Sequence, residues 1–449
     1  MYVCGPTVYD VPHLGHGRFV LVFDVLRRYL EFTGLEVRYV SNVTDIDDKI
    51  IARASAEGRT EAEVAAEFEG VWFDATDALG VKRPDETPHA TGYVGDMVAL
   101  VGALEGAGVA YESADGVYLS VEAIDGYGLL ARQSLESLRA GARVEPGEHK
   151  RSPLDFALWK KAKPGEPSWP SPWGPGRPGW HTECVVMSLD LLGEGFDLHG
   201  GGIDLAFPHH ENERAQAEGL HRRFARHWVH NGWVMVEGEK MSKSLGNFTS
   251  LTDLLARADA RAYRLLVLRA HYRSPIEVTP ATVDQAEKSL ARLDELARRF
   301  DLDPALGSVP AAEAAGVGAD SAAVAAFVER MEDDLDTPGA LAGVFELARR
   351  AHAAADRGES GDARRLATTV AVLGGAVGLA LQAGATMAVG EGAGTGLDAE
   401  TAAKAAERDA ARAERDFARA DALRAELEGE GWVVEDGPEG TRLRRRRGA

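Results

Sequence analysis

Cysteine is almost absent from this chain, which has two in 449 residues. Two cysteines cannot build a disulfide framework, which excludes a small disulfide-stabilised secreted scaffold. Long hydrophobic runs are also missing, since no stretch approaches the roughly 20 apolar residues of a membrane span. The start of the chain, MYVCGP, has no basic segment followed by an apolar core, so no secretory signal is visible. We expect a cytoplasmic protein without a membrane partner. No heptad or exposed apolar segment demands a second subunit, so we also expect a monomer.

Positive charge is scarce: 50 Lys and Arg stand against 71 Asp and Glu, a formal net charge of −21. Such a protein repels phosphate at long range, which excludes a general polyanion binder. A local basic strip remains compatible with nucleic acid, and one lies at the C-terminal end, where Arg442 and Arg444 belong to an arginine run. A solvated tail is the alternative interpretation of that run.

The N-terminal residues predict a βαβ unit. Residues 1–8 are rich in β-branched and aromatic side chains, and residues 16–33 carry apolar side chains at helical spacing. Gly34 stands where a glycine ends a helix, and residues 36–43 again read as a strand. A strand, a helix and a strand over this length indicate a parallel sheet, whose ligands bind at the carboxyl ends of the strands.

The length suggests about three domains, and the fold class we expect is α/β. Residues 180–202 and 228–236 read as a return to the parallel sheet. Residues 398–429 read as one long helix and residues 431–443 as a β-ribbon. The predicted organisation is a Rossmann-like parallel-sheet domain (1–91 and 151–247) split by an insertion (92–150), a helical bundle (248–388), a linker (389–397) and a small α+β module (398–449).

Two short motifs suit phosphate chemistry. His13-Leu14-Gly15-His16 lies at the turn between the first strand and its helix, where unpaired N–H groups and two imidazoles can meet an anion. Histidines at helix starts also serve as caps, and this is the competing interpretation. Lys240 and Lys243 belong to KMSKS, a short segment whose two ammonium groups can stabilise charge developing on a triphosphate. The two motifs together are far more specific than either alone.

A third group of residues has the chemistry of a metal site. Cys4 and Cys184 are the only cysteines, and His209 and Glu213 stand at i and i+4 in PHHENE. Two thiolates, an imidazole and a carboxylate form a set that zinc accepts. Packing of two buried cysteines is the alternative. His210 is the alternative to His209 as the imidazole ligand, and the sequence spacing does not decide between the two.

HLGH and KMSKS together resemble the signatures of the class I aminoacyl-tRNA synthetases. MYVCGPTVYD, NVTDIDDKI, PGWHTEC, HGGGIDLAFPHHENE and KMSKSLGNF are each similar to stretches of the cysteinyl-tRNA synthetases. The resemblance runs from residue 1 to DGPEGTR near the C-terminus. It implies a ligase that activates L-cysteine with ATP and Mg²⁺ and transfers the cysteinyl group to the 3′ end of tRNA-Cys.

The resemblance implies one zinc ion held by Cys4, Cys184, His209 and Glu213, which binds the substrate thiolate. Serine offers only a harder hydroxyl, so the metal separates the two amino acids without an editing domain. His13, Gly15 and His16 would meet ATP, with the histidines on its α- and β-phosphates. Lys240 and Lys243 would close as the transition state forms.

Three further residues complete the expected cysteine pocket: Asp204 for the substrate ammonium, and Thr44 and Trp180 for its walls. Ordinary turn or core packing is the alternative for each of them. Asp45, Asp47 and Asp48 resemble a carboxylate trio for magnesium, but we interpret them as helix-capping and structural residues.

In this family the helices at 248–388 contact the tRNA stem and the module at 398–449 reads the anticodon. Trp432, Arg442 and Arg444 are the candidate tRNA contacts here. Family members tend to carry an aromatic residue beside the last basic cluster, where this chain has Arg442-Leu443-Arg444. They also carry a further segment ahead of the MYVCG strand. We therefore expect Cys4 either to fray or to be held by neighbouring strands and by zinc.

Two rival functions remain. One is a ligase of the same fold that joins cysteine to an amino sugar, a group of proteins that ends without an anticodon module. The other is a catalytically silent RNA-binding paralogue. The intact motifs and the long C-terminal part favour the synthetase over both.

Overall fold

The structure is a computed structural model that describes residues 1–132, 149–235, 250–382, 387–388, 399–414, 416–437 and 440–445. Its centre is a parallel sheet in the order β1 (Tyr2–Val3), β6 (Leu198–Gly202) and β7 (His227–Asn231). Single parallel bridges extend this sheet beyond β1, from Tyr2 to Val40 and from Val40 to Glu86. The expected Rossmann-like parallel sheet is confirmed: Glu86, Val40 and β1 lie on one side of it, and β6 and β7 on the other.

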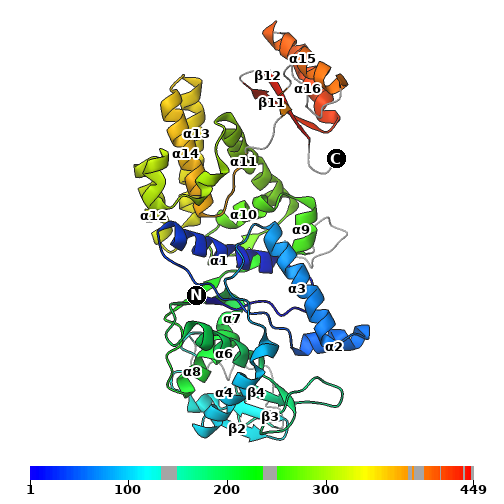
Figure 1. Cartoon of the computed structure of the whole chain (residues 1–449), viewed down its shortest axis with the longest axis vertical. Coiled ribbons are helices and arrows are strands. Elements are labelled where there is room, and N and C mark those ends of the chain that lie inside the picture. The colour runs from blue at the N-terminus through cyan, green and yellow to red at the C-terminus, as the bar shows by residue number, and fades with distance from the viewer. Residues whose placement is uncertain are drawn as a thin grey trace.

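The first helix, α1 (Leu14–Phe32), follows the prediction closely and ends at Gly34, whose φ of +93° suits a residue without a side chain. It lies between the sheet and the C-terminal helices (Figure 1). Asp24 on α1 is buried and accepts a 2.6 Å hydrogen bond from the Arg264 guanidinium of α10 (Ala260–Leu268). This helix therefore links the site-bearing sheet to the bundle.

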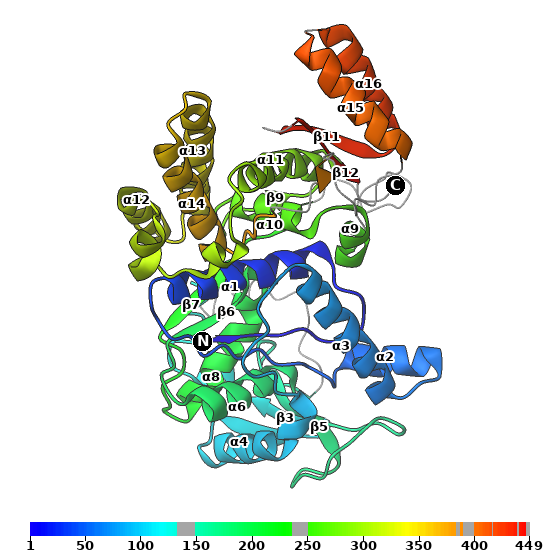
Figure 2. The same cartoon turned by 45° about the horizontal axis from the view of Figure 1, so that its top comes forward.

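The inserted unit is larger than the sequence suggested. Its antiparallel sheet has the order β2 (Ala110–Ser113), β3 (Gly116–Leu119), β4 (Phe156–Lys161) and β5 (Gly176–Pro178). The last two strands lie beyond residue 150, so the unit extends to Pro178 (Figure 2). Helix α4 (Val94–Gly106) packs on this sheet, whereas α2 (Asp48–Glu57) and α3 (Glu61–Ala78) pack on each other and on Val8 and Val43.

The segment after this sheet is helical at first, which corrects the strand-like interpretation of 180–202. Helix α6 spans Trp180–Leu192, and β6 begins only at Leu198. The four consecutive residues Thr182–Val185 are all buried, so this turn of the helix is enclosed on every side. After β6 come α7 (Ile203–Leu205), a turn of π-helix (Ala206–His210) and α8 (Glu211–Gly219).

Residues 250–382 are helical, as predicted, apart from β9 (Ile276–Glu277), which pairs in parallel with β8 (Val234–Met235). The remaining helices of this part are α9 (Leu251–Arg257), α11 (Pro280–Arg299), α12 (Ser321–Glu332), α13 (Thr337–Asp356) and α14 (Ser360–Ala376). No helix in the described part of the chain is long and apolar enough to cross a bilayer.

The C-terminal module contains two helices where one was expected. Helix α15 (Ala399–Ala413) and α16 (Phe417–Gly429) are separated at Asp416, whose side chain caps α16 by accepting from the Arg419 N–H. The predicted ribbon is present as β11 (Trp432–Gly437) and β12 (Gly440–Arg445), with β10 (Met387–Ala388) on the other edge of β12. The predicted linker at 389–397 lies outside the described residues.

Candidate functional site

The HLGH turn forms the N-terminus of α1 through a reciprocal pair of hydrogen bonds. The His16 N–H donates to Nδ1 of His13 at 3.3 Å, and the His13 N–H donates to Nδ1 of His16 at 3.2 Å. The two rings stack with centroids 3.7 Å apart. Gly15 makes this possible, because a Cβ there would lie 2.9 Å from the His13 ring.

This arrangement fixes what the two imidazoles can offer. Each Nδ1 accepts a backbone hydrogen bond, so in the neutral ring the proton is on Nε2. Burial lowers the pKa of His16 to about 3, helped by His13 and Lys49. Burial also lowers the pKa of His13, outweighing the opposite effect of Asp204. Capping and ligand contact are therefore compatible: the Nδ1 atoms cap, and the Nε2–H groups remain as neutral donors.

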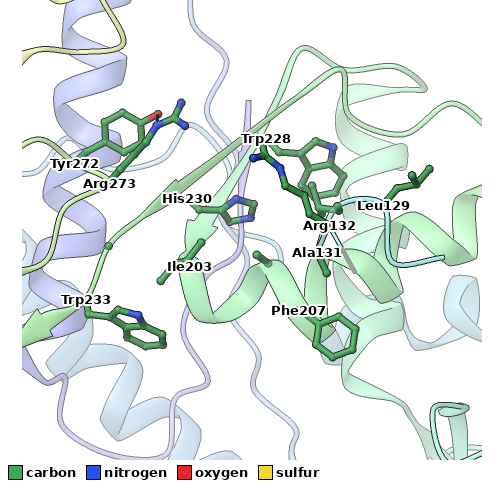
Figure 3. A pocket seen from close by; sticks show the side chains of 13 residues that line it. Leu129, Ala131, Arg132, Ile203, Phe207, Trp228, His230, Trp233, Tyr272 and Arg273 are labelled. Atoms are coloured by element: carbon green, nitrogen blue, oxygen red, sulfur yellow. Dashed lines mark hydrogen bonds between the residues drawn. The ribbon is translucent and has the colours of Figure 1, made fainter. Parts of the chain in front are cut away.

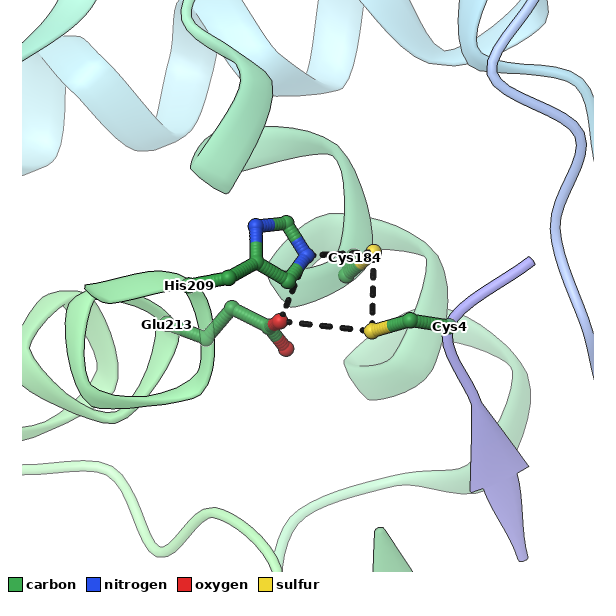
Figure 4. Close-up of side chains that lie close together, drawn as sticks. All are labelled: Cys4, Cys184, His209 and Glu213. Carbon is green, nitrogen blue, oxygen red and sulfur yellow. Dashed lines mark hydrogen bonds and ion pairs between the residues drawn. The ribbon is translucent and has the colours of Figure 1, made fainter. Parts of the chain in front are cut away.

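The second constellation gathers both cysteines. Cys4 follows β1, Cys184 lies within α6, His209 comes from the turn after β6, and Glu213 projects from α8 (Figure 4). All four side chains are buried, with at most 5% of any residue exposed. The structure thus brings together residues spread over more than 200 positions of sequence.

The spacing of these donor atoms fits a tetrahedral metal ion. Ligands of one zinc ion at bond lengths of 2.0–2.3 Å lie about 3.3–3.8 Å apart. Cys4 Sγ lies 3.6 Å from Cys184 Sγ and 3.4 Å from Glu213 Oε1, and Cys184 Sγ lies 3.6 Å from His209 Nε2. The His209 Nε2–Glu213 Oε1 distance of 3.0 Å is shorter and is that of an ion pair.

The protonation states also favour a cation. Burial alone would raise the pKa of Cys184, but hydrogen bonds from Cys4 and His209 outweigh it and lower that pKa to about 6. Burial and the neighbouring Cys184 raise the pKa of Cys4. Despite burial, His199 and His209 hold the pKa of Glu213 well below its usual range. Despite burial, the carboxylate of Glu213 and the thiolate of Cys184 raise the pKa of His209 to about 10, so the cluster carries one surplus negative charge at neutral pH, and a metal ion would displace the proton of His209 as it binds.

A second donor set overlaps the first and contains the rival histidine. Cys4 and Glu213 also lie near His199 and His210. However, His199 Nε2 is only 2.6 Å from Glu213 Oε2, which is a hydrogen-bond distance and too short for two ligands of one ion. His199 therefore has the position of an outer group that orients the carboxylate. Nδ1 of each rival histidine has a ring partner at 2.8 Å, His230 for His210 and His181 for His209. It is therefore the short His199–Glu213 contact of the second set that favours His209 as the ligand.

A pocket of about 800 Å³ adjoins this cluster (Figure 3). One wall is the turn after β6, another is the tip of the inserted unit, and a third is the segment after β7 with the 272–273 turn. His230 in its lining reaches back to His210 of the second donor set. Its labelled lining residues are Leu129, Ala131, Arg132, Ile203, Phe207, Trp228, His230, Trp233, Tyr272 and Arg273.

The three predicted pocket residues have different surroundings. The Trp180 ring is partly exposed and stacks on His209, with centroids 4.2 Å apart, so it borders the cluster. Thr44 is buried, and its hydroxyl donates to Glu183 Oε2 at 2.7 Å. Asp204 is exposed at the start of α7, within electrostatic reach of His13.

The aspartate trio is structural, as interpreted. Asp47 caps α2 by accepting from the Lys49 N–H, and Asp48 pairs with Lys160 at 2.7 Å. Asp45 accepts from the Thr91 N–H at 2.9 Å. These contacts give each carboxylate a partner within the protein.

Of the three predicted tRNA contacts, only Trp432 has a side chain among the described residues. Trp432 is 2% exposed and packs on Leu427 and Leu443, so its indole is not available to stack on a base. The sequence did not show this, because a tryptophan at a strand start is equally suited to a small core. Arg442 and Arg444 belong to β12, but their side chains lie outside the described residues, as do Lys240 and Lys243.

Sequence reasoning assigned no role to the outer residues of the cluster. His199 and His181 contact Glu213 and His209, and Glu183 adjoins Thr44. The sequence hint for these residues was their position inside motifs: His199 lies in HGGG, and His181 and Glu183 lie in WHTEC. Adjacency alone could not reveal which of them turn toward the cluster.

Comparison with known proteins agrees with this architecture. A family model described as the tRNA synthetases class I (C) catalytic domain matches residues 1–288, and a DALR domain matches residues 326–382. The chain is 47% identical to the cysteine--tRNA ligase of Dechloromonas aromatica, over 99% of this chain and 94% of that protein. The enzyme of the same name from Alkalilimnicola ehrlichii is also 47% identical, over 99% and 95% respectively.

A solved structure agrees at the level of the fold. Methionyl-tRNA synthetase of Mycobacterium tuberculosis, in complex with methionyl-adenylate, superposes with a TM-score of 0.59 at 18% identity, covering 84% of this chain and 89% of that one. The full-length match at 47% identity is far more specific. On this evidence the chain belongs to the class I cysteine--tRNA ligase family.

Proposed function

We propose that this protein activates L-cysteine with ATP and Mg²⁺ and attaches it to the 3′ end of tRNA-Cys. The observation that carries the proposal is the buried cluster of two thiols, an imidazole and a carboxylate, found together with the HLGH turn in one domain. In the first step the substrate carboxylate attacks the α-phosphate, forming cysteinyl-adenylate and releasing pyrophosphate. In the second, the terminal ribose hydroxyl of the tRNA attacks the carbonyl and AMP leaves.

The residues proposed to hold one zinc ion are Cys4, Cys184, His209 and Glu213. When bound, zinc supplies a soft Lewis acid that takes a thiolate in preference to a hydroxyl. The carboxylate of Glu213 is the donor that would yield its place, since it is the hardest of the four. Trp180, stacked on His209, is suited to form the wall beside the substrate side chain, with Thr44 beneath. Asp204 is proposed to pair with the substrate ammonium.

For ATP, we assign the phosphates to His13 and His16, with Gly15 leaving the helix N-terminus open. Their Nε2–H groups donate without carrying charge, so positive charge must come from elsewhere, and Lys240 and Lys243 are its proposed source. The aromatic pocket beside the cluster has room for an adenosine group.

The helical part (248–388) is proposed to contact the tRNA stem, and the module at 398–449 the anticodon, with Arg442 and Arg444 among its contacts. That module is what favours the synthetase over an amino-sugar ligase, together with relatives matched over nearly their whole length. Intact motifs argue against a silent paralogue. We further propose that it acts as a monomer in the cytoplasm, where charged tRNA is consumed.

The test is charging of tRNA-Cys with labelled cysteine, before and after removal of zinc by a chelator. We expect charging that depends on zinc and excludes serine, together with cysteine-dependent exchange of pyrophosphate into ATP. Exchange without any charging would indicate the amino-sugar ligase. A folded protein that neither exchanges nor charges would refute the proposal.

A further inference from the structure

Arg18 is a buried arginine with an unusual set of partners. It stands on α1, two residues after His16, and is wholly buried. Among the residues that the structure describes, no carboxylate forms an ion pair with it. Instead its guanidinium donates to backbone carbonyls: Nη1 to Trp233 O at 2.5 Å, and Nη2 to Tyr272 O at 3.0 Å and to Ser274 O.

A guanidinium placed this way costs free energy that only its hydrogen bonds can offset. Burial lowers the pKa of Arg18 to about 10, still well above neutrality, so the group stays charged. An ordinary core position would be filled by an apolar side chain without this cost. The cation therefore marks a place where several backbone segments have to be held together.

The segments it holds meet at one junction. The Gly232 N–H donates to Tyr272 O at 2.8 Å, and the Ile276 N–H donates to Trp233 O at 2.9 Å. Gly232 allows a very close approach here, because a Cβ would lie 2.5 Å from Arg273 O. Arg18 adds a charged donor to both carbonyls of this junction, and so ties it to α1.

The same junction forms a wall of the pocket described above. Gly232, Trp233, Tyr272 and Arg273 all line it, and the Trp233 ring is 53% exposed. In Figure 3 the Trp233 and Tyr272 side chains stand along one side of the pocket, opposite Arg132 and Phe207. Tyr263 of α10 also holds the HLGH turn, by donating to Leu14 O at 2.6 Å, but Arg18 is bonded to the pocket wall itself.

We propose that Arg18 is a positioning residue for ATP: it sets this pocket wall at the right distance from His13 and His16. The inference rests on the proposed function, since it assumes that the pocket takes the adenosine part of ATP while the two histidines take its phosphates. The planar fork of arginine reaches two carbonyls at once, which a single lysine ammonium cannot do in the same geometry.

The experiment measures pyrophosphate exchange by Arg18→Lys with ATP and cysteine each varied. Its matched control is Arg27→Lys, on the same helix, because Arg27 is also buried and donates to a backbone carbonyl, that of Arg83, at 2.8 Å. Arg27 reaches neither the junction nor the pocket, and pairs instead with Glu31 and Asp85. Both variants keep the positive charge, and melting temperatures are recorded for both.

For Arg18→Lys we expect kcat/KM for ATP to fall roughly tenfold or more, the equivalent of one charged hydrogen bond. The KM for cysteine and the zinc content should stay at their wild-type values. Arg27→Lys should lose a similar amount of melting temperature and keep its ATP kinetics. Unchanged ATP kinetics in Arg18→Lys, or an equal loss toward ATP and cysteine, would overturn the proposal. An inactive wild-type protein would instead refute the function on which it rests.

Discussion

Replacing Cys184 or His210 tests which donors bind the metal, and the two candidate sets predict opposite results. Both sets share Cys4 and Glu213, but only the first contains Cys184 and only the second contains His210. Zinc binding of roughly 10–16 kcal/mol, shared among four donors, gives about 2.5–4 kcal/mol for each. Loss of a ligand should therefore weaken zinc binding roughly 70- to 900-fold.

Removal of an outer group has a smaller effect, about 10–100-fold in metal affinity. We place His210 among the outer groups because its donor set contains the His199 Nε2–Glu213 Oε2 contact of 2.6 Å, which is too short for two ligands of one ion. We therefore expect Cys184→Ala to be isolated without zinc. His210→Gln should retain one zinc per chain and release it to a competing chelator more easily than the wild type.

The assay is metal content by mass spectrometry, followed by titration of each zinc-loaded protein with a chromophoric chelator. Melting temperatures identify any variant that lost metal because it did not fold. If His210→Gln lost its zinc while a folded Cys184→Ala kept it, the second set would hold the metal and our reading of the 2.6 Å His199–Glu213 contact would be wrong.

Three further variants probe the surroundings of the site. Thr44→Val should lower the free energy of unfolding by roughly 1–3 kcal/mol in urea denaturation, because the buried carboxyl of Glu183 loses its hydrogen-bond partner; an unchanged midpoint would contradict this. Asp24→Ala should cost roughly 3–5 kcal/mol in the same assay, because Arg264 becomes a buried unpaired charge, whereas a loss below 1 kcal/mol would show that water reaches it. Burial lowers the pKa of His16 from 6.5 to about 3 in the folded protein. Above pH 6.5 the imidazole is neutral in the folded and the unfolded chain, and as the pH falls toward 3 the unfolded chain takes up the proton more readily, so the folded state loses stability. His16→Asn should therefore show a smaller loss of melting temperature than the wild type between pH 6.5 and 4, and parallel curves would refute the assignment.

Local signals predicted the parts of the fold that local chemistry determines. Helix α1 follows from the spacing of its apolar residues and from Gly34 at its end. The spacing of apolar residues likewise predicted the ribbon β11–β12 and the helices of residues 250–382. Trp180–Leu192 was misread because continuous burial over Thr182–Val185, with valines beside the cysteine, removes the helical periodicity from the sequence.

The candidate site could be predicted as a set of residues but not as a geometry. The donor types and motifs identified Cys4, Cys184 and Glu213 without any structure. The sequence could not separate His209 from His210, because adjacent residues differ only in the direction in which the turn after β6 points them. Nor could it show that Trp432 is buried, since that depends on the packing of α15 and α16 on the ribbon.

Confining both sulfhydryl groups to one buried cluster has a practical consequence for labelling. If Cys4 and Cys184 hold zinc as proposed, the metal acts as a protecting group for both native thiols of the chain, which has only two. A cysteine introduced on the exposed face of α15 would then be the single target for a maleimide dye. Fluorescence from such a dye would follow tRNA docking without a cysteine-free background, and a second dye appearing after chelation would report the fraction of molecules that had lost their metal.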